Sequence, residues 1–170
     1  MRVYVPATLA MLARLVADGS LHAVNGTVFA VTPRLRESYA DGDEDELADV
    51  ALRDAALASL RLIGDSDAQP TAGSPARRVV LEADVDDAAA TLRPDLDDAV
   101  VRLAGAISLE RVIAAYVDNA AAESAVLAAV EVIDAADLGD EDAELTVGDA
   151  QDHDLAWYAP QELPFLLELL

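Results

Sequence analysis

Residues 77–85 read Arg-Arg-Val-Val-Leu-Glu-Ala-Asp-Val and lie close to the midpoint of the 170-residue chain. A period of two in hydrophobicity is typical of a strand with one buried face and one largely solvated face. A loop rich in Pro, Gly and Ser precedes this stretch and an acidic segment follows it. We therefore expect a central strand whose sheet is shared by both halves of the chain. Its alternating positions are Val79, Leu81, Ala83 and Val85 against Arg78, Val80, Glu82 and Asp84.

Helices are predicted on the N-terminal side of this strand. Thr8 can cap a first helix, in which apolar residues recur at helical spacing until Gly19 ends it. Residues 33–39 are typical of a turn or a short helical piece. A longer helix spans about residues 45–63, and Gly64 is expected to terminate it. Residues 65–76 then form a long surface loop.

A strand and a hairpin are also predicted in this half. Residues 1–5 are β-prone and are followed by Pro6, which is expected to stop the strand. Asn25-Gly26 readily supplies the two positive-φ positions of a tight turn, so a small hairpin is expected there. Residues 41–46 are acidic but lack the Gly and Glu positions of a calcium-binding loop, so they are expected to stabilise the start of the next helix.

Strands, helices and two acidic loops are predicted in the second half of the chain. Residues 111–117 could extend the helix that follows, but their β-branched and aromatic side chains favour a strand. Asp118-Asn119 then offers a natural helix cap. The expected segments are an acidic loop at 86–98, strands at 99–104, 111–117 and 155–158, a helix at 120–136, an acidic loop at 137–154 and a terminal helix at 161–170.

This order of elements predicts a single α+β domain over residues 1–170. Hairpin-type connections between strands with one apolar face favour a mainly antiparallel sheet with helices packed on one face. The expected topology is a ferredoxin-like core with an extra hairpin and a terminal helix.

Composition excludes several classes of chemistry. Cysteine is absent, so there are no disulfides, thiol nucleophiles or thiolate metal sites. All the basic residues are arginine, so there is no Schiff-base lysine and no Walker A loop. No glycine-rich nucleotide loop and no Gly-x-Ser-x-Gly motif occurs. We expect no cofactor.

The net charge of the chain indicates which kinds of partner it can bind. The formal net charge of −22 disfavours nucleic acid and anionic membranes. It suits a basic protein partner, a divalent cation, mimicry of nucleic acid or simple solubility. No apolar run near 18 residues and no signal-like N-terminus is found, so we expect a cytoplasmic protein.

Two groups of candidate site residues stand out. Asp152, His153 and Asp154 place an imidazole between two carboxylates, a pattern that can bind a divalent metal or supply a base. The alternative is an exposed loop histidine, because neighbours in sequence seldom point the same way.

The second group lies at the last strand and the central strand. Tyr158 and Glu162 flank a strand-to-helix junction beside Trp157, where a pocket could form. The alternative is that Trp157 fills the core and Tyr158 directs its hydroxyl to solvent. Arg78 shares a face of the central strand with Glu82 and Asp84, as a solvated or helix-covered row of ion pairs.

Two segments resemble a known family. Residues 1–12 (Met-Arg-Val-Tyr-Val-Pro-Ala-Thr-Leu-Ala-Met-Leu) and 153–163 (His-Asp-Leu-Ala-Trp-Tyr-Ala-Pro-Gln-Glu-Leu) are similar to an uncharacterised actinobacterial protein family. The likeness spans most of the chain and implies a bacterial cytoplasmic protein. It brings no activity with it, and no functional residue is carried over.

Two functions from different classes remain open. The first is a non-enzymatic interaction module that binds another protein or a second copy of itself, with His153, Trp157, Tyr158, Glu162 and Arg78 as binding candidates. The second is a small divalent-metal-assisted enzyme that uses acidic-loop carboxylates and His153.

Overall fold

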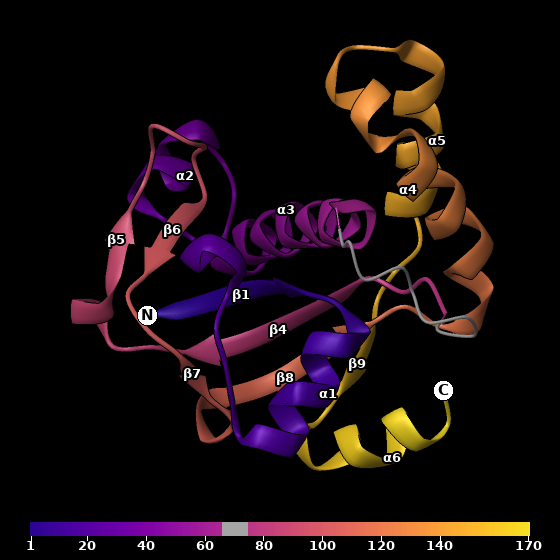
Figure 1. Ribbon diagram of the computed structural model, residues 1–170. Coiled ribbons are helices and arrows are strands. Elements are labelled where there is room, and N and C mark those ends of the chain that lie inside the picture. Colours follow the sequence, from indigo (N-terminus) through magenta and orange to yellow (C-terminus); the bar gives the residue numbers. More distant parts are fainter. Residues whose placement is uncertain (66–74) are drawn as a thin grey trace.

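The computed structural model describes residues 1–65 and 75–170, and it is a mixed α and β fold (Figure 1). Seven strands form one sheet in the order β5-β6-β3-β1-β4-β8-β9, and every pairing in it is antiparallel. The prediction of an α+β chain with a mainly antiparallel sheet is confirmed; the ferredoxin-like core is not. The strands are β1 Arg2–Ala7, β2 Ser20–Leu21, β3 Thr27–Phe29, β4 Val79–Asp84, β5 Ala90–Leu92, β6 Val100–Leu103, β7 Ile107–Ser108, β8 Val112–Val117 and β9 Ala156–Tyr158, of which β2 and β7 pair with each other.

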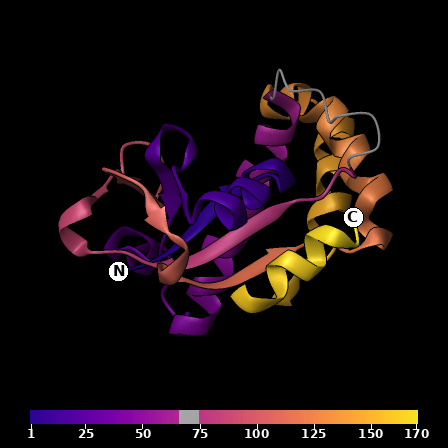
Figure 2. The ribbon, with the colours of Figure 1, turned by 60° about the horizontal axis from the view of Figure 1, so that its bottom comes forward.

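Helices cover both faces of the sheet, so the prediction of a single covered face was wrong. Val3 and Val5 pack with α1 and α6 on one face, while Tyr4 and Val80 pack with α3 on the other. Figure 2 shows α6, in yellow, running across the strands on the face that it shares with α1. Both faces of the central strands carry apolar residues, which is why each face needs a cover. The helices are α1 Leu9–Asp18, α2 Pro33–Ser38, α3 Glu44–Asp65, α4 Glu123–Asp137, α5 Glu141–Gln151 and α6 Leu163–Glu168.

The two central strands, β1 and β4, pair over their full lengths. Their register runs from Arg2↔Asp84 to Ala7↔Val79 and includes Pro6 opposite Val80. Pro6 therefore does not end the strand as expected. Its missing N–H is tolerated because the other neighbour, β3, pairs with β1 only at Tyr4.

A buried serine joins α3 to both central strands. The Ser59 hydroxyl donates to the Ala7 carbonyl at 2.7 Å and accepts from the Val79 N–H at 3.0 Å. Ser59 is fully buried, so these bonds satisfy polar groups that water does not reach. The helix is thereby fixed over the point where β1 ends and β4 begins.

A buried ion pair stands beside this junction. Arg78 and Asp118 are 1% and 0% exposed, and the guanidinium donates to both carboxylate oxygens at 2.7 and 2.9 Å. The Arg78 backbone N–H donates to the same carboxylate at 2.7 Å. The Nη1 group of Arg78 donates to the Gln151 side chain, and its Nη2 group also donates to the His153 carbonyl, both at 2.8 Å. Arg78 was expected on a solvated or helix-covered face with Glu82 and Asp84; it is enclosed, and Arg2 pairs with those carboxylates instead.

The turn chemistry at Asn25-Gly26 was predicted correctly, but the hairpin was not. Both residues have positive φ, 57° and 69°. The strands on either side pair elsewhere, β2 with β7 and β3 with β1 and β6. A Cβ at Gly26 would lie 2.6 Å from the Leu103 carbonyl oxygen, so close approach to β6 also favours glycine.

Three segment predictions were wrong for identifiable reasons. Gly64 lies inside α3, where it packs near Val130 of α4 instead of ending the helix. Part of the acidic stretch 86–98 forms β5, which is too short to show a period. Within residues 137–154, α5 begins after Asp140, whose carboxylate accepts from the Ala143 N–H at 2.9 Å. The expected loop at 65–76 lies mostly outside the described residues.

The other segment predictions are confirmed. Thr8 caps α1, and Gly19 ends that helix with a φ of 79°. Helix α2 occupies the expected short segment, and β6, β8, β9, α4 and α6 lie where strands and helices were predicted. In Figure 1 the α4–α5 hairpin rises beside the end of α3. Leu60, Val126 and Ile133 belong to the core cluster between them. No helix in the described ranges has the length and apolarity to cross a membrane.

One carboxylate of α3 is held in an unfavourable environment. Burial, and next the negative charges of Asp97 and Asp98, raise the pKa of Asp54 to about 6; Arg53 and Arg61 oppose the shift. The folded protein therefore binds a proton at Asp54 more tightly than the unfolded chain does. Protonation of Asp54 stabilises the fold, and this contribution is fully present at low pH. It is lost as the pH rises from about 4 to about 6.

Arg78→Met should lower the free energy of unfolding by about 3–5 kcal/mol, because it leaves the Asp118 carboxylate buried without its partner. Urea unfolding followed by circular dichroism measures the loss. Arg111→Gln breaks a half-exposed pair with Asp86 and should cost about 1 kcal/mol or less. Equal losses in the two variants would contradict the assigned role of the buried pair.

Asp54→Asn should stabilise the protein at pH 7 by about 1–3 kcal/mol and have no effect below pH 4. Thermal melts from below pH 4 to pH 8 test this, with Asp49→Asn, an exposed carboxylate of the same helix, as the control. A stability difference that does not change with pH would show that Asp54 titrates normally.

Candidate functional site

Strand β9 forms one edge of the sheet and brings together most of the residues singled out in the sequence. It follows α5 and leads through the 3-10 turn Pro160–Glu162 into α6. Trp157 and Tyr158 lie in the strand, His153 precedes it and Glu162 follows it. Among the described residues, no strand lies beyond β9 on this side of the sheet.

The two aromatic residues of β9 point to opposite faces. Tyr158 packs against the core on the α1 and α6 face. Trp157 is 57% exposed and pairs in register with Tyr116 of β8, so their side chains share a face. Tyr116 and Leu155 pack against the core beneath α3, which identifies that face. The alternative in which Trp157 fills the core is therefore wrong.

The backbone of Trp157 is directed away from the sheet. Asp118 N–H donates to the Arg78 carbonyl, so alternate residues of β8, including Tyr116, direct their backbone groups toward β4. Ala115 and Val117 then bond to β9, where Tyr158 and Ala156 are their partners. The N–H and C=O of Trp157 consequently face outward.

Glu162 accepts a hydrogen bond from the next backbone N–H that faces outward on this edge, that of Ala159. Its carboxylate accepts from the Ala159 backbone N–H at 3.2 Å, within the turn that precedes α6. The side chain was predicted as a binding candidate, and the structure places it as a cap. The open edge of β9 is thus centred on Trp157.

Carboxylates and one arginine affect the tyrosines of this face. Burial, and next the negative charge of Glu82, raise the pKa of Tyr116; Asp49 of α3 contributes in the same direction and Arg2 opposes it. Tyr4, on the same face, also has a raised pKa, because of burial and then the charge and hydrogen bond of Glu82. Glu82 lies 3.6 Å from the Arg2 guanidinium, which bonds to Asp84 at 2.7 Å.

The predicted metal ligands do not form a cluster. His153 is half-buried and uses its main-chain carbonyl to accept from Arg78, while Asp152 ends α5 and Asp154 is exposed. In residues 1–65 and 75–170, no three His, Asp or Glu side chains are arranged to hold a metal ion. The geometry therefore gives the metal-assisted enzyme no support.

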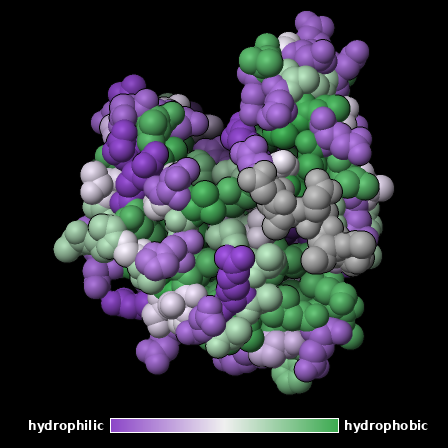
Figure 3. Space-filling view, viewed as in Figure 1, coloured by the Kyte–Doolittle hydropathy of each residue, from purple (hydrophilic) through white to green (hydrophobic). Residues whose placement is uncertain are grey.

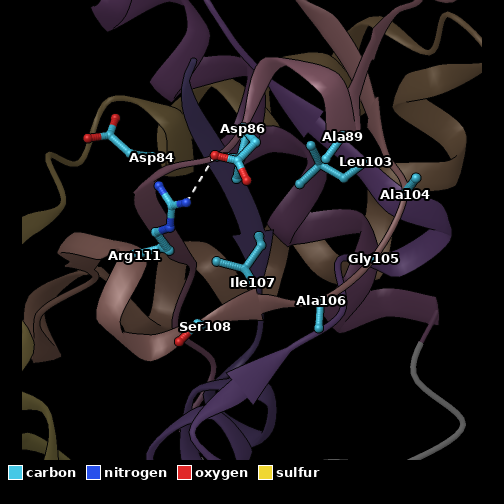
Figure 4. Close-up of a pocket in the computed structure, with 11 residues that line it drawn as sticks. Asp84, Asp86, Ala89, Leu103, Ala104, Gly105, Ala106, Ile107, Ser108 and Arg111 are labelled. Atoms are coloured by element: carbon cyan, nitrogen blue, oxygen red, sulfur yellow. Dashed lines mark hydrogen bonds and ion pairs between the residues drawn. The ribbon is translucent and has the colours of Figure 1, made fainter.

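In the described part of the chain, two small cavities lie away from β9. One, of about 180 Å³, is lined by the turns after β4 and β6, and the Arg111–Asp86 ion pair crosses its side at 3.0 Å (Figure 4). The other, of about 220 Å³, lies between α2 and β5. Ligand pockets are usually about 300–1,000 Å³, so both are small for a metabolite. Neither is lined by His153, Tyr158 or Glu162.

Exposed apolar residues also occur on the helices. Leu127, Leu138 and Leu145 lie on or between α4 and α5, and Figure 3 shows apolar residues among hydrophilic ones on that lobe. Phe165 is exposed on α6, and Leu169 and Leu170 are exposed after it. None of these residues lies in a strand, whereas Trp157 stands on an open strand edge in register with Tyr116.

Sequence reasoning missed two residues of this site. Tyr116 lies in the stretch predicted as a strand, and Asp49 lies in the stretch predicted as the long helix. The sequence contains no sign that β8 and β9 pair at Tyr116↔Trp157. An edge strand with an exposed tryptophan is chemically suited to hold an extended chain, through one pair of backbone hydrogen bonds and aromatic contact.

Comparison with known proteins gives a family without an activity. No curated protein matches the chain, and no solved structure matches it. A model for a family of unknown function, DUF6912, matches residues 1–167. Since this match covers almost the whole chain, the protein belongs to the DUF6912 family.

Proposed function

We propose that the protein is a non-enzymatic binding module that takes up an extended segment of another protein at β9. The observation that supports this most is the 57% exposure of Trp157, the single tryptophan of the chain, on an edge strand. A tryptophan contributes more binding energy at protein interfaces than most side chains, and an unpaired strand edge offers backbone hydrogen bonds.

The rest of the molecule is consistent with this role. Trp157 is presented by a strand whose one neighbour, β8, is paired on both sides, and Tyr158 of the same strand packs against the core on the other face. A rigid support of this kind reduces the ordering cost of binding. The net charge of −22 favours a protein partner over nucleic acid or an anionic membrane. The proposal includes a bacterial cytoplasmic setting, in line with the family resemblance.

A displayed library of random peptides tests the proposal. We expect enriched peptides whose binding changes the fluorescence of Trp157, because this residue is the only tryptophan in the chain. Trp157→Ala should weaken binding of the enriched peptides by about ten-fold or more, measured by isothermal titration calorimetry.

Phe165→Ala provides the matched control. Phe165 is 68% exposed on α6, which packs on the opposite face of the sheet, so its removal should leave peptide affinity unchanged. The proposal fails if no enriched peptide distinguishes Trp157→Ala from the wild-type protein, or if Phe165→Ala has the larger effect.

A further inference from the structure

We propose that the partner segment is basic, and that an arginine or lysine side chain of that segment stacks on Trp157 and Tyr116. This inference rests on the proposed function and specifies its ligand. It is carried by the aromatic pair, by the carboxylates around it and by the charge of the whole chain.

Tyr116 and Trp157 are cross-strand neighbours on one face of the sheet. Tyr116 and Trp157 are directly opposite, and the outward direction of the Trp157 backbone makes them a non-hydrogen-bonded pair of the β8–β9 ladder. Side chains at such a pair approach most closely, with Cβ atoms about 4.5–5.5 Å apart. Tryptophan is the best aromatic partner for ammonium and guanidinium groups, and tyrosine also serves.

Carboxylates near the rings are placed to add to this attraction. Asp49 is exposed on α3, the helix that covers the face of Tyr116, and Glu82 and Asp49 raise the pKa of Tyr116 while Arg2 opposes them. The same face already holds one guanidinium, since Arg2 lies between Glu82 and Asp84.

Further acids lie at the two ends of β9. Asp152 and Asp154 are exposed before the strand, and Glu162 is exposed after it. The nearby Arg78 does not offset them, because it is buried and paired with Asp118. A segment lying along β9 would therefore pass exposed carboxylates at both ends.

Charge also decides between a foreign segment and a second copy of this chain. With a net charge of −22, two copies that approach through β9 bring like charges together, which opposes association at moderate salt. A basic segment is attracted from a distance by the same charge. We therefore assign the edge to a basic segment of another protein.

The peptide selection described above separates this inference from the proposed function. If enriched peptides depend on Trp157 and are rich in arginine or lysine, both stand. If they depend on Trp157 but are neutral or acidic, the basic-segment inference is overturned while the binding function survives. If none depends on Trp157, the function itself fails.

Synthetic peptides then test the contact directly. The probe is a peptide of about ten residues with alternating arginine and valine, and its analogues carry lysine or glutamine in place of arginine. We expect the arginine and lysine peptides to change Trp157 fluorescence, and the glutamine peptide to bind at least about ten-fold more weakly. Equal binding of all three would overturn the inference.

Matched variants separate a local contact from attraction to any acidic surface. Asp49→Asn should weaken the arginine peptide by about three-fold, whereas Asp18→Asn, the same charge change at the end of α1 on the other face, should not. Trp157→Ala keeps the charge and should lose most of the affinity. Equal effects of the two aspartate variants, or no effect of Trp157→Ala, would show that the peptide is held by the overall negative charge and not at β9. Either result would overturn the inference.

Sedimentation equilibrium tests whether a second copy of this chain binds at β9 instead. The wild-type protein should be monomeric at micromolar concentration in moderate salt. A dimer that dissociates in Trp157→Ala would show that a second copy occupies the edge, and it would overturn the basic-segment assignment.

Discussion

The buried ion pair between Arg78 and Asp118 is the interaction on which the second half of the structure depends. Both side chains are fully enclosed, and burial of two charges is costly unless each finds its hydrogen-bond partners. Arg78 meets this requirement with contacts to Asp118, Gln151 and the His153 carbonyl. These acceptors come from the end of β8, from α5 and from the segment that leads into β9. One side chain at the start of β4 thus joins elements that lie far apart in sequence.

The same contacts determine how β9 is presented. The Gln151 side chain accepts from Arg78 and donates to the Arg53 carbonyl of α3, so the end of α5 is held against both the sheet and the helix. Arg77 extends the connection to α4 through Glu123 at 2.8 Å. With the chain before β9 held in this way, the strand pairs with β8 in the register that places Trp157 beside Tyr116. The exposed aromatic edge is a consequence of buried electrostatics.

Local pattern predicted the individual elements well and their arrangement less well. Alternation over 77–85 identified the central strand, and the cap at Thr8 located α1. The same alternation suggested a solvated face, because a pattern of polar residues does not show that Arg78 has a buried partner 40 residues away at Asp118. In α5, acidity concealed the apolar spacing of Ala143, Val147 and Ala150, all of which are buried. Trp157 was identified as a candidate, but its exposure follows from strand order, which no local pattern contains.

Hydrogen exchange of Arg78→Lys tests most directly whether Arg78 positions the β9 edge. Lysine keeps the positive charge but lacks the planar fork that contacts Asp118, Gln151 and His153 together. The amides of residues 152–158 should exchange at least about ten-fold faster than in the wild-type protein, while those in the middle of β1 and β4 keep their protection. Unchanged exchange at β9, or an equal loss of protection throughout the sheet, would contradict this account.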